Sequence, residues 1–204
     1  MSFPDYSVED EVSSLGYKYV VGTDEAGRGS GSGPVVAAAV NIPKEHRPLF
    51  INKVNDSKKL SPKKREELFD LIMQNCMVGV QDISPEIIDK INILEATKLA
   101  MRSSIEQLGY FDYILIDGTV DLSKYIKDCP MQKIIRGDSK SVSIAAASII
   151  AKVTRDRIML RLHEEWPIYS WDKNKGYLTK DHIDAINTYG ITKYHRQSFK
   201  KVGR

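Results

Sequence analysis

Residues 17–42 read YKYVVGTDEAGRGSGSGPVVAAAVNI, in which two apolar runs enclose a loop rich in glycine. The runs 17–22 and 35–42 predict two strands, and their apolar residues hardly alternate with polar ones, as in a sheet covered on both faces. Two adjacent acids, Asp24 and Glu25, stand where the first run ends. The stretch therefore predicts two buried strands with carboxylates at one end.

Predicted helices and strands alternate along the rest of the chain. Helical signals cover 61–75, 92–109, 141–166 and 179–190, and strand signals cover 77–84, 113–117 and 132–138. Ser61, Asn92 and Thr179 stand where three of these helices begin and are predicted to cap them. The alternation predicts an α/β fold with one central sheet.

Length and composition describe one globular domain. The chain has 204 residues, of which 42% are hydrophobic and 28% charged, which is enough for a complete core. No apolar run approaches the roughly 20 residues that a membrane helix needs, and the acidic segment at about 1–16 does not resemble a secretory signal. Cys76 and Cys129 match no metal or redox spacing, so two free thiols are expected. We therefore expect a monomeric cytoplasmic protein that does not enter membranes.

Basic residues gather in two places, although the net charge is only +3. One cluster lies at 58–65, and the other is a tail at about 193–204 that contains no acids. Each fits a solvated helix face or a flexible end as well as it fits a contact with a polyanion, so both interpretations stay open. The members are Lys58, Lys59, Lys63, Lys64 and Arg65, and Lys193, Arg196, Lys200, Lys201 and Arg204.

Four acids follow predicted strands, namely Asp24, Glu25, Asp117 and Asp138. Any one of them alone would be typical of a turn or a helix cap. Open α/β sheets place their chemistry beyond strand ends, where these carboxylates would repel one another unless cations neutralised them. Hard oxygen ligands without His or Cys suit Mg²⁺ or Mn²⁺, and two such ions about 4 Å apart promote phosphodiester hydrolysis. The pattern predicts a metal-dependent phosphoryl-transfer site.

Asp156 competes with Asp138 for the fourth position. If the long helix begins near residue 141, Asp156 lies about 15 residues along it, roughly 22 Å from its start at 1.5 Å per residue. The two acids then cannot reach one pair of metal ions. Because Asp138 follows a strand, as the other acids do, we choose Asp138 and expect Asp156 to pair with a neighbouring arginine.

The glycine loop matches neither a phosphate-binding P-loop nor a dinucleotide fingerprint, because the required offsets and the following helix are missing. It fits a flexible turn, or a place where a polymer strand approaches bare backbone beside the metal site.

Eight stretches carry a resemblance to the type 2 ribonuclease H family, the bacterial ribonuclease HII. They lie in the family's order and extend over about 17–199. The stretches are GTDEAGRG, GPVVAAAV, NDSKKLSP, NILEATKLAM, LIDG, GDSKSVSIAAASIIAKVTRDR, NKGYLTKDH and YHRQSF.

The resemblance implies a ribonuclease H-like fold, a mixed central sheet flanked by helices, with additional C-terminal helices. It implies an endonuclease that hydrolyses the RNA strand of RNA–DNA hybrids and cuts on the 5′ side of ribonucleotides embedded in duplex DNA. The products carry a 3′-hydroxyl and a 5′-phosphate, and a water activated by two Mg²⁺ or Mn²⁺ ions is the nucleophile. By the same resemblance, the metal ligands are Asp24, Glu25, Asp117 and Asp138.

The family's Gly-Arg-Gly motif corresponds to Gly27, Arg28 and Gly29, and its tyrosine that senses the 2′-hydroxyl corresponds to Tyr177. We expect Lys58 and the basic tail to contact phosphates. The segment Ser30-Gly31-Ser32 departs from the bulkier residues that the family usually has here, and it is expected to loosen the loop.

Two other functions are weighed. A type 3 ribonuclease H shares the carboxylates, but it normally carries an N-terminal substrate-binding domain, and only about 16 residues precede the first strand here. A catalytically silent hybrid-binding module gains nothing from carboxylates that face phosphate.

We expect no catalytic role for the histidines, which are placed at the surface or behind the site, and core or hinge packing for the tryptophans. These residues are His46, His163, His182 and His195, and Trp166 and Trp171.

Overall fold

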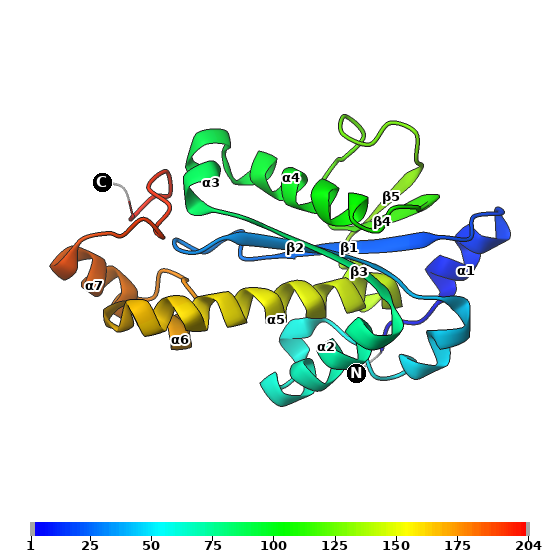
Figure 1. The fold of residues 1–204 in the computed structure, drawn as a ribbon, viewed down its shortest axis with the longest axis horizontal. Coiled ribbons are helices and arrows are strands. Elements are labelled where there is room, and N and C mark those ends of the chain that lie inside the picture. Colours follow the sequence, from blue (N-terminus) through cyan, green and yellow to red (C-terminus); the bar gives the residue numbers. More distant parts are fainter. Residues whose placement is uncertain (1–2, 203–204) are drawn as a thin grey trace.

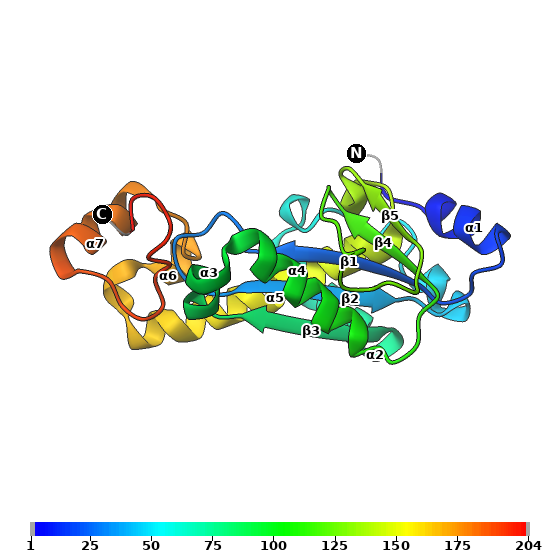
Figure 2. The same ribbon diagram turned by 90° about the horizontal axis from the view of Figure 1, so that it is seen from above.

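The computed structural model describes residues 3–202, which form a five-stranded sheet with the order β3-β2-β1-β4-β5 (Figures 1 and 2). The antiparallel pairs are β1–β2 and β2–β3, and the parallel pairs are β1–β4 and β4–β5. The mixed sheet of the expected fold is therefore confirmed. The strands are β1 (Val20–Ala26), β2 (Val35–Asn41), β3 (Met77–Ile83), β4 (Tyr113–Asp117) and β5 (Met131–Ile134).

The four helices predicted from the sequence are present, with Ser61, Asn92 and Thr179 accepting hydrogen bonds from first-turn N–H groups as predicted. These helices are α2 (Pro62–Asn75), α4 (Ile93–Glu106), α5 (Val142–Glu165) and α7 (Lys180–Tyr189). Three shorter helices were not predicted, namely α1 (Ser7–Ser14), α3 (Pro85–Ile91) and α6 (Trp171–Asn174). Within residues 3–202, no helix combines the length and the apolar character needed to cross a membrane.

Helices cover both faces of the sheet, with α3 and α4 on one side and α2 and α5 on the other (Figure 1). Every residue of β2 is buried, because its alternate side chains pack against α4 on one face and α5 on the other. This double cover explains why the strand reads as a continuous apolar run.

Helix α5 approaches β1 closely at Gly22. A Cβ at this position would collide with the backbone of Ser143 and Ile144, so only glycine lets the helix lie against the strand. The contact places the first turns of α5 beside the end of β1 that carries the acids.

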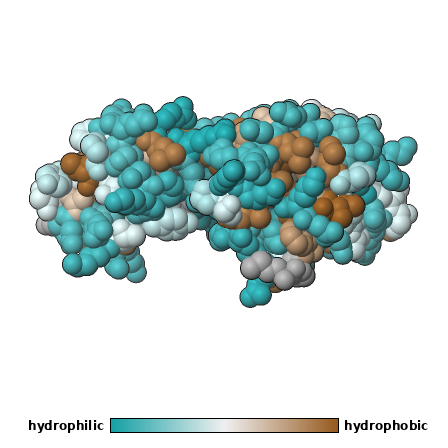
Figure 3. All heavy atoms as spheres, turned by 90° about the horizontal axis from the view of Figure 1, so that it is seen from below, coloured by the Kyte–Doolittle hydropathy of each residue, from teal (hydrophilic) through white to brown (hydrophobic). Residues whose placement is uncertain are grey.

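The second half of α5 extends beyond the sheet and builds a smaller lobe with α6 and α7 (Figures 1 and 2). This C-terminal lobe has its own core, which includes Met159, Tyr169 and Trp171. The outline of the molecule is notched between the lobe and the larger body, and the surface around the notch is mostly hydrophilic (Figure 3). Trp171 is a core residue as predicted, whereas Trp166 is 37% exposed.

The basic C-terminal segment is folded against the body through residue 202, so a flexible end is excluded there. Arg196 is completely buried, and its backbone N–H donates to the carbonyl of Gly31. His195 forms an isolated antiparallel bridge with Ser32. Arg196 is therefore not available to a phosphate, while Arg204 lies outside the described residues.

Candidate active site

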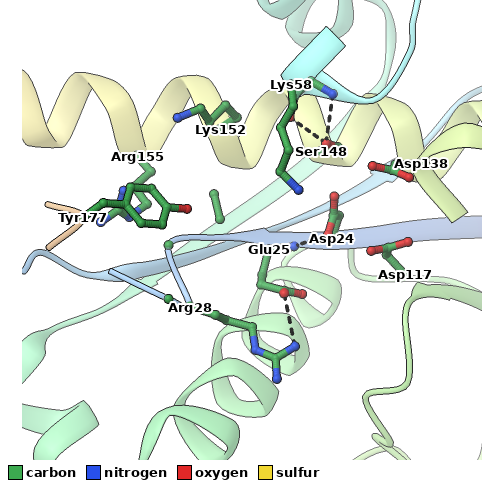
Figure 4. Close-up of a pocket in the computed structure, with 14 residues that line it drawn as sticks. Asp24, Glu25, Arg28, Lys58, Asp117, Asp138, Ser148, Lys152, Arg155 and Tyr177 are labelled. Atoms are coloured by element: carbon green, nitrogen blue, oxygen red, sulfur yellow. Dashed lines mark hydrogen bonds and ion pairs between the residues drawn. The ribbon is translucent and has the colours of Figure 1, made fainter. Parts of the chain in front are cut away.

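One pocket of about 350 Å³ is lined by all four predicted acids, Asp24, Glu25, Asp117 and Asp138 (Figure 4). The predicted substrate-binding residues line it as well, namely Gly27, Arg28, Gly29, Lys58 and Tyr177. The structure thus brings together every site residue that the sequence predicted.

Strand pairing places Asp24 beside Asp117. The last paired residues of the parallel strands β1 and β4 are Thr23 and Ile116, and the two aspartates follow directly. Asp24 and Glu25 lie inside β1 and not beyond it, because β1 stays paired with β2 as far as Ala26. Alternation along the strand sends the two acids in opposite directions, Asp24 toward Lys58 and Glu25 toward Arg28 (Figure 4).

The sequence predicted that Asp138 directly follows a strand, and this prediction is wrong. Strand β5 ends at Ile134, and Asp138 lies in a 3₁₀ turn, Gly137–Ser139, that leads into α5. The turn departs from the strand because Arg136 adopts a left-handed conformation, with φ of 55°. The N–H of Gly137 donates to Oδ1 of Asp117 at 2.6 Å, which brings the turn against the end of β4.

Burial and mutual repulsion shape the acid electrostatics. Burial raises the pKa of Asp24 well above its usual value, and the negative charges of Glu25 and Asp117 raise it further. Burial also raises the pKa of Asp138, with a further contribution from Asp56. The negative charges of these carboxylates are therefore crowded together in a partly desolvated pocket.

Two cations partly compensate this charge. Burial raises the pKa of Glu25, while the nearby Arg28 guanidinium, 3.4 Å from Oε1, and Lys58 act to lower it. Lys58 is exposed, belongs to the 3₁₀ turn Ser57–Lys59 and extends toward the acids (Figure 4). Both cations are at the edge of the pocket, which suits a polyanion that approaches from outside.

The acid set fits hard divalent cations. It offers carboxylate oxygens, with no thiol or imidazole lining the pocket. The repulsion that raises the pKa of Asp24 would be relieved by cations between the acids. Within residues 3–202, no three Asp, Glu, His or Cys side chains already converge closely enough to hold an ion.

Tyr177 lies across the pocket from the acids, in the loop between α6 and α7. Its side chain is 46% exposed, and its ring lies beside Gly29, where a Cβ would be 3.8 Å from Cε1. The hydroxyl points into the pocket (Figure 4). Tyrosine and the Gly-Arg-Gly backbone thus face one small volume.

The segment Ser30-Gly31-Ser32 is not loose, contrary to expectation. Both serines are completely buried, and the N–H groups of Gly31 and Ser32 donate to the carbonyl of Gly176. A Cβ at Gly31 would lie 2.5 Å from the Leu178 side chain. The small residues allow the loop to pack tightly against the segment that carries Tyr177.

Sequence reasoning missed several residues of the pocket wall. Ser148, Lys152 and Arg155 line the pocket from α5, and their spacing of four and three residues marks one face of a helix. This spacing on one helix face could have been recognised in the sequence. Asp156 lies outside the pocket lining and pairs with Lys152 at 2.7 Å, not with an arginine.

His182 and His195 are buried core residues, so of their two expected places, at the surface or behind the site, the structure gives them the second. The Nε2 atoms of the two rings are 3.2 Å apart, and Trp171 Nε1 donates to His182 Nε2. The Nδ1 atom of His182 lies 2.9 Å from the carbonyl of Tyr177. The histidines therefore support the tyrosine loop from behind.

A mixed sheet that gathers four carboxylates in one pocket, with cations at the rim, defines a metal-dependent nuclease of the ribonuclease H type. The family pattern of ribonuclease HII matches residues 21–202. The chain belongs to the ribonuclease HII family.

Relatives called ribonuclease HII align over nearly the whole chain. One from Bacillus subtilis (strain 168) is 47% identical over 96% of this chain and 75% of its own length. Another, from Wolbachia sp. subsp. Brugia malayi (strain TRS), is 45% identical over 99% of this chain and 96% of its own length.

Solved structures share the fold. Ribonuclease HII of Archaeoglobus fulgidus, solved in a complex with PCNA, is 31% identical, with a TM-score of 0.76 over 89% of this chain and 95% of that one. A ribonuclease HIII, Bst-RNase HIII, solved with Mn²⁺, is 19% identical, with a TM-score of 0.73 over 90% of this chain and 68% of that one, and shows a common fold only.

Family membership makes this protein a metal-dependent endoribonuclease with ribonuclease H activity on RNA–DNA hybrids. The catalytically silent binding module is thereby set aside. The family match also favours type 2 over type 3 ribonuclease H.

Proposed function

We propose that this enzyme also cuts duplex DNA on the 5′ side of single embedded ribonucleotides, leaving a 3′-hydroxyl and a 5′-phosphate. The observation that carries the proposal is one pocket in which four carboxylates face Tyr177 and the Gly27–Gly29 backbone. Such a pocket offers a place for the scissile phosphate beside a place for one ribose. We place this activity in the cytoplasm and assign it to a monomer.

The four acids are the proposed ligands of two Mg²⁺ or Mn²⁺ ions. When bound, such ions activate a water and stabilise charge on the leaving oxygen. Asp24 and Asp117 contribute from adjacent strands, and Asp138 contributes from the turn after β5. Because these elements belong to the rigid core, the carboxylates are held in place before substrate binds.

Tyr177 and the Gly27–Gly29 backbone are the proposed readers of the 2′-hydroxyl. The absence of a side chain at Gly29 lets a sugar come close to main-chain groups, whereas the space beside Gly27 is filled by Arg155. The Tyr177 hydroxyl supplies a side-chain partner from the opposite wall. A deoxyribose would leave these polar groups unpaired, which is costly once the bound substrate has excluded water from them.

Arg28 and Lys58 are the proposed phosphate contacts. Both are exposed at the pocket edge, where a cation positions a nucleic-acid backbone without reading its sequence. Lys58→Ala should therefore weaken binding of hybrid and DNA duplex alike and reduce the salt dependence of binding by about one ion.

The test is cleavage of three labelled duplexes of one sequence: RNA–DNA hybrid, DNA with one ribonucleotide, and DNA only. We expect metal-dependent cleavage of the first two, with a single cut 5′ of the ribonucleotide, and none of the third. Cleavage of the hybrid without cleavage of the single-ribonucleotide duplex would contradict the proposal and leave the family activity intact.

A further inference from the structure

Two arginines are buried without an acidic partner. Arg155 is 1% exposed and Arg196 is completely buried, and neither takes part in an ion pair with any residue in the range 3–202. Burying an unpaired guanidinium is costly. An apolar side chain would fill the same space at a lower cost. The role of the two arginines must therefore lie in the hydrogen bonds that they donate.

Arg155 connects two loops through all three nitrogens of its guanidinium. Nε donates to the carbonyl of Pro34 at 2.9 Å, and Nη2 donates to the carbonyl of Ser32 at 3.0 Å. On the other side, Nη1 donates to the carbonyl of Lys175 at 2.9 Å. One side chain thus spans from the end of the glycine loop to a residue two positions before Tyr177.

Arg196 holds the same glycine loop from the C-terminal segment. Its Nε donates to the carbonyl of Gly33 at 2.9 Å, and its Nη1 donates to the carbonyl of Arg28 at 3.1 Å. Because the loop is neither helix nor strand, its carbonyls lack regular partners, and the two guanidinium groups supply them.

The fit around Arg155 leaves no freedom. A Cβ at Gly27 would overlap the Arg155 guanidinium, and one at Gly176 would lie 2.5 Å from the carbonyl oxygen of Ser32. Lysine could not reproduce the contacts, because it lacks the planar fork of donors that reaches three carbonyls at once.

We propose that Arg155 is a positioning residue that fixes the separation between the Gly27–Gly29 backbone and Tyr177 and thereby sets discrimination between ribose and deoxyribose. The inference rests on the proposed ribose reader. Arg155 acts through the two loops, because each of its three guanidinium nitrogens donates to a main-chain carbonyl, those of residues 34, 175 and 32.

The first experiment compares Arg155→Lys with the parent on the single-ribonucleotide duplex. We expect kcat/KM to fall about 10- to 100-fold, since displacement of a positioning group by about 1 Å can cost that much, while Mn²⁺ binding measured by calorimetry is retained. The control is Arg157→Ala on the same helix, whose side chain pairs with Glu66 outside the pocket; it should stay within about twofold. An Arg155→Lys variant that cleaves like the parent overturns the inference.

A double-variant cycle separates positioning from general destabilisation. If Arg155 acts through the tyrosine reader, Arg155→Lys should cost little more once Tyr177→Phe has removed the hydroxyl. If the losses in kcat/KM of the two single variants simply multiply in the double variant, the inference is overturned, while the proposed role of Tyr177 in ribose recognition is unaffected. No loss in Tyr177→Phe alone would instead contradict the proposed function.

A measurement on the unaltered protein applies even if Arg155→Lys does not fold. Gly31 and Ser32 donate to the carbonyl of Gly176 across the joint that Arg155 spans. We expect their amides to exchange with solvent as slowly as those of β1. Exchange at the rate of an open loop would overturn the inference, because no fixed separation would then exist.

Discussion

The backbone N–H of Gly137 donates to Oδ1 of Asp117 at 2.6 Å. Together with the pairing of β4 and β5, this bond ties the turn that carries Asp138 to the end of β4, although 20 residues separate Gly137 from Asp117. The bond also fixes one carboxylate oxygen of Asp117, which lines the pocket. Asp117 is thus both a member of the acid site and a residue that holds the neighbouring turn in place.

Asp24→Asn and Asp117→Asn should each lower cleavage at limiting Mg²⁺ by at least about 100-fold, because each removes a ligand charge from the proposed metal site. Binding of an RNA–DNA hybrid, measured by fluorescence anisotropy, should survive, since phosphate contacts come from cations elsewhere. Activity near that of the parent in either variant would refute the role of that carboxylate.

Mn²⁺ should stabilise the parent more than these variants. At a concentration about 100-fold above its dissociation constant, a ligand that binds only the folded state adds about 2.7 kcal/mol to the free energy of unfolding. We therefore expect a rise in Tm of several degrees in the parent and a much smaller one in Asp24→Asn. An equal rise in both proteins would place the metal elsewhere.

Tyr177→Phe should reduce cleavage of the single-ribonucleotide duplex by about 10- to 100-fold, because a hydroxyl of the substrate loses its partner. Tyr177→Ala should lose about tenfold more, since packing of the ring against the sugar goes too. The Tm of both should stay close to that of the parent, because the side chain is 46% exposed. Equal rates for the three proteins would show that ribose recognition lies elsewhere.

Gly22→Ala should lower the free energy of unfolding by about 3 kcal/mol, because its Cβ meets the backbone of α5 and no flexible side chain can give way. Gly109→Ala is the matched control. Its φ of 78° is unfavourable for alanine, but nothing lies within 4 Å of a Cβ there, so a loss of about 1 kcal/mol is expected. Urea unfolding measures both, and equal losses would contradict the backbone contact.

The C-terminal lobe should lose stability as the pH falls from about 6.5 toward 4. Burial lowers the pKa of His195 to about 4, and it lowers the pKa of His182 as well. The unfolded chain, with an ordinary histidine pKa near 6.5, then binds more protons than the folded one in this interval, and stability decreases on acidification.

Trp171 reports this loss, because it is fully buried and donates to His182. The chain has two tryptophans. In the variant Trp166→Phe, the tryptophan fluorescence comes from Trp171 alone. A red shift on acidification between pH 6.5 and 4 is expected. The raised pKa values of Asp24 and Asp138 have the opposite effect and stabilise the folded chain on acidification. An unchanged emission of Trp171 at pH 4 would mean that the histidines do not control the stability of the lobe.

The sequence predicted elements well where one local signal dominates. Continuous apolar runs predicted β2 and β4, and cap residues such as Asn92 predicted where helices begin. The four acids were found because each stands near the end of an apolar strand, and the parallel neighbours β1, β4 and β5 bring these ends together.

Features that depend on distant partners were not predictable. Ser30-Gly31-Ser32 looks flexible by itself, but distant partners that include the carbonyl of Gly176 and two arginines make it rigid. Arg196 and His195 lie in a basic segment that is typical of a tail, yet tertiary hydrogen bonds bury both. In α1, Glu9 is 1% exposed because it accepts hydrogen bonds from Ser141 and Ser143 at the start of α5.

The bridge between Ser32 and His195 joins residues 163 positions apart in the sequence. Since a ribosome makes the chain from its N-terminus, the glycine loop is synthesised early but stays without its partners until residues 155, 176 and 196 have emerged. The nascent chain therefore cannot complete this pocket while most of it is already exposed to the RNA-rich surroundings of the ribosome. For the same reason, a chain that stops within α7 contains all four acids but lacks the contacts of His195 and Arg196 that hold the glycine loop.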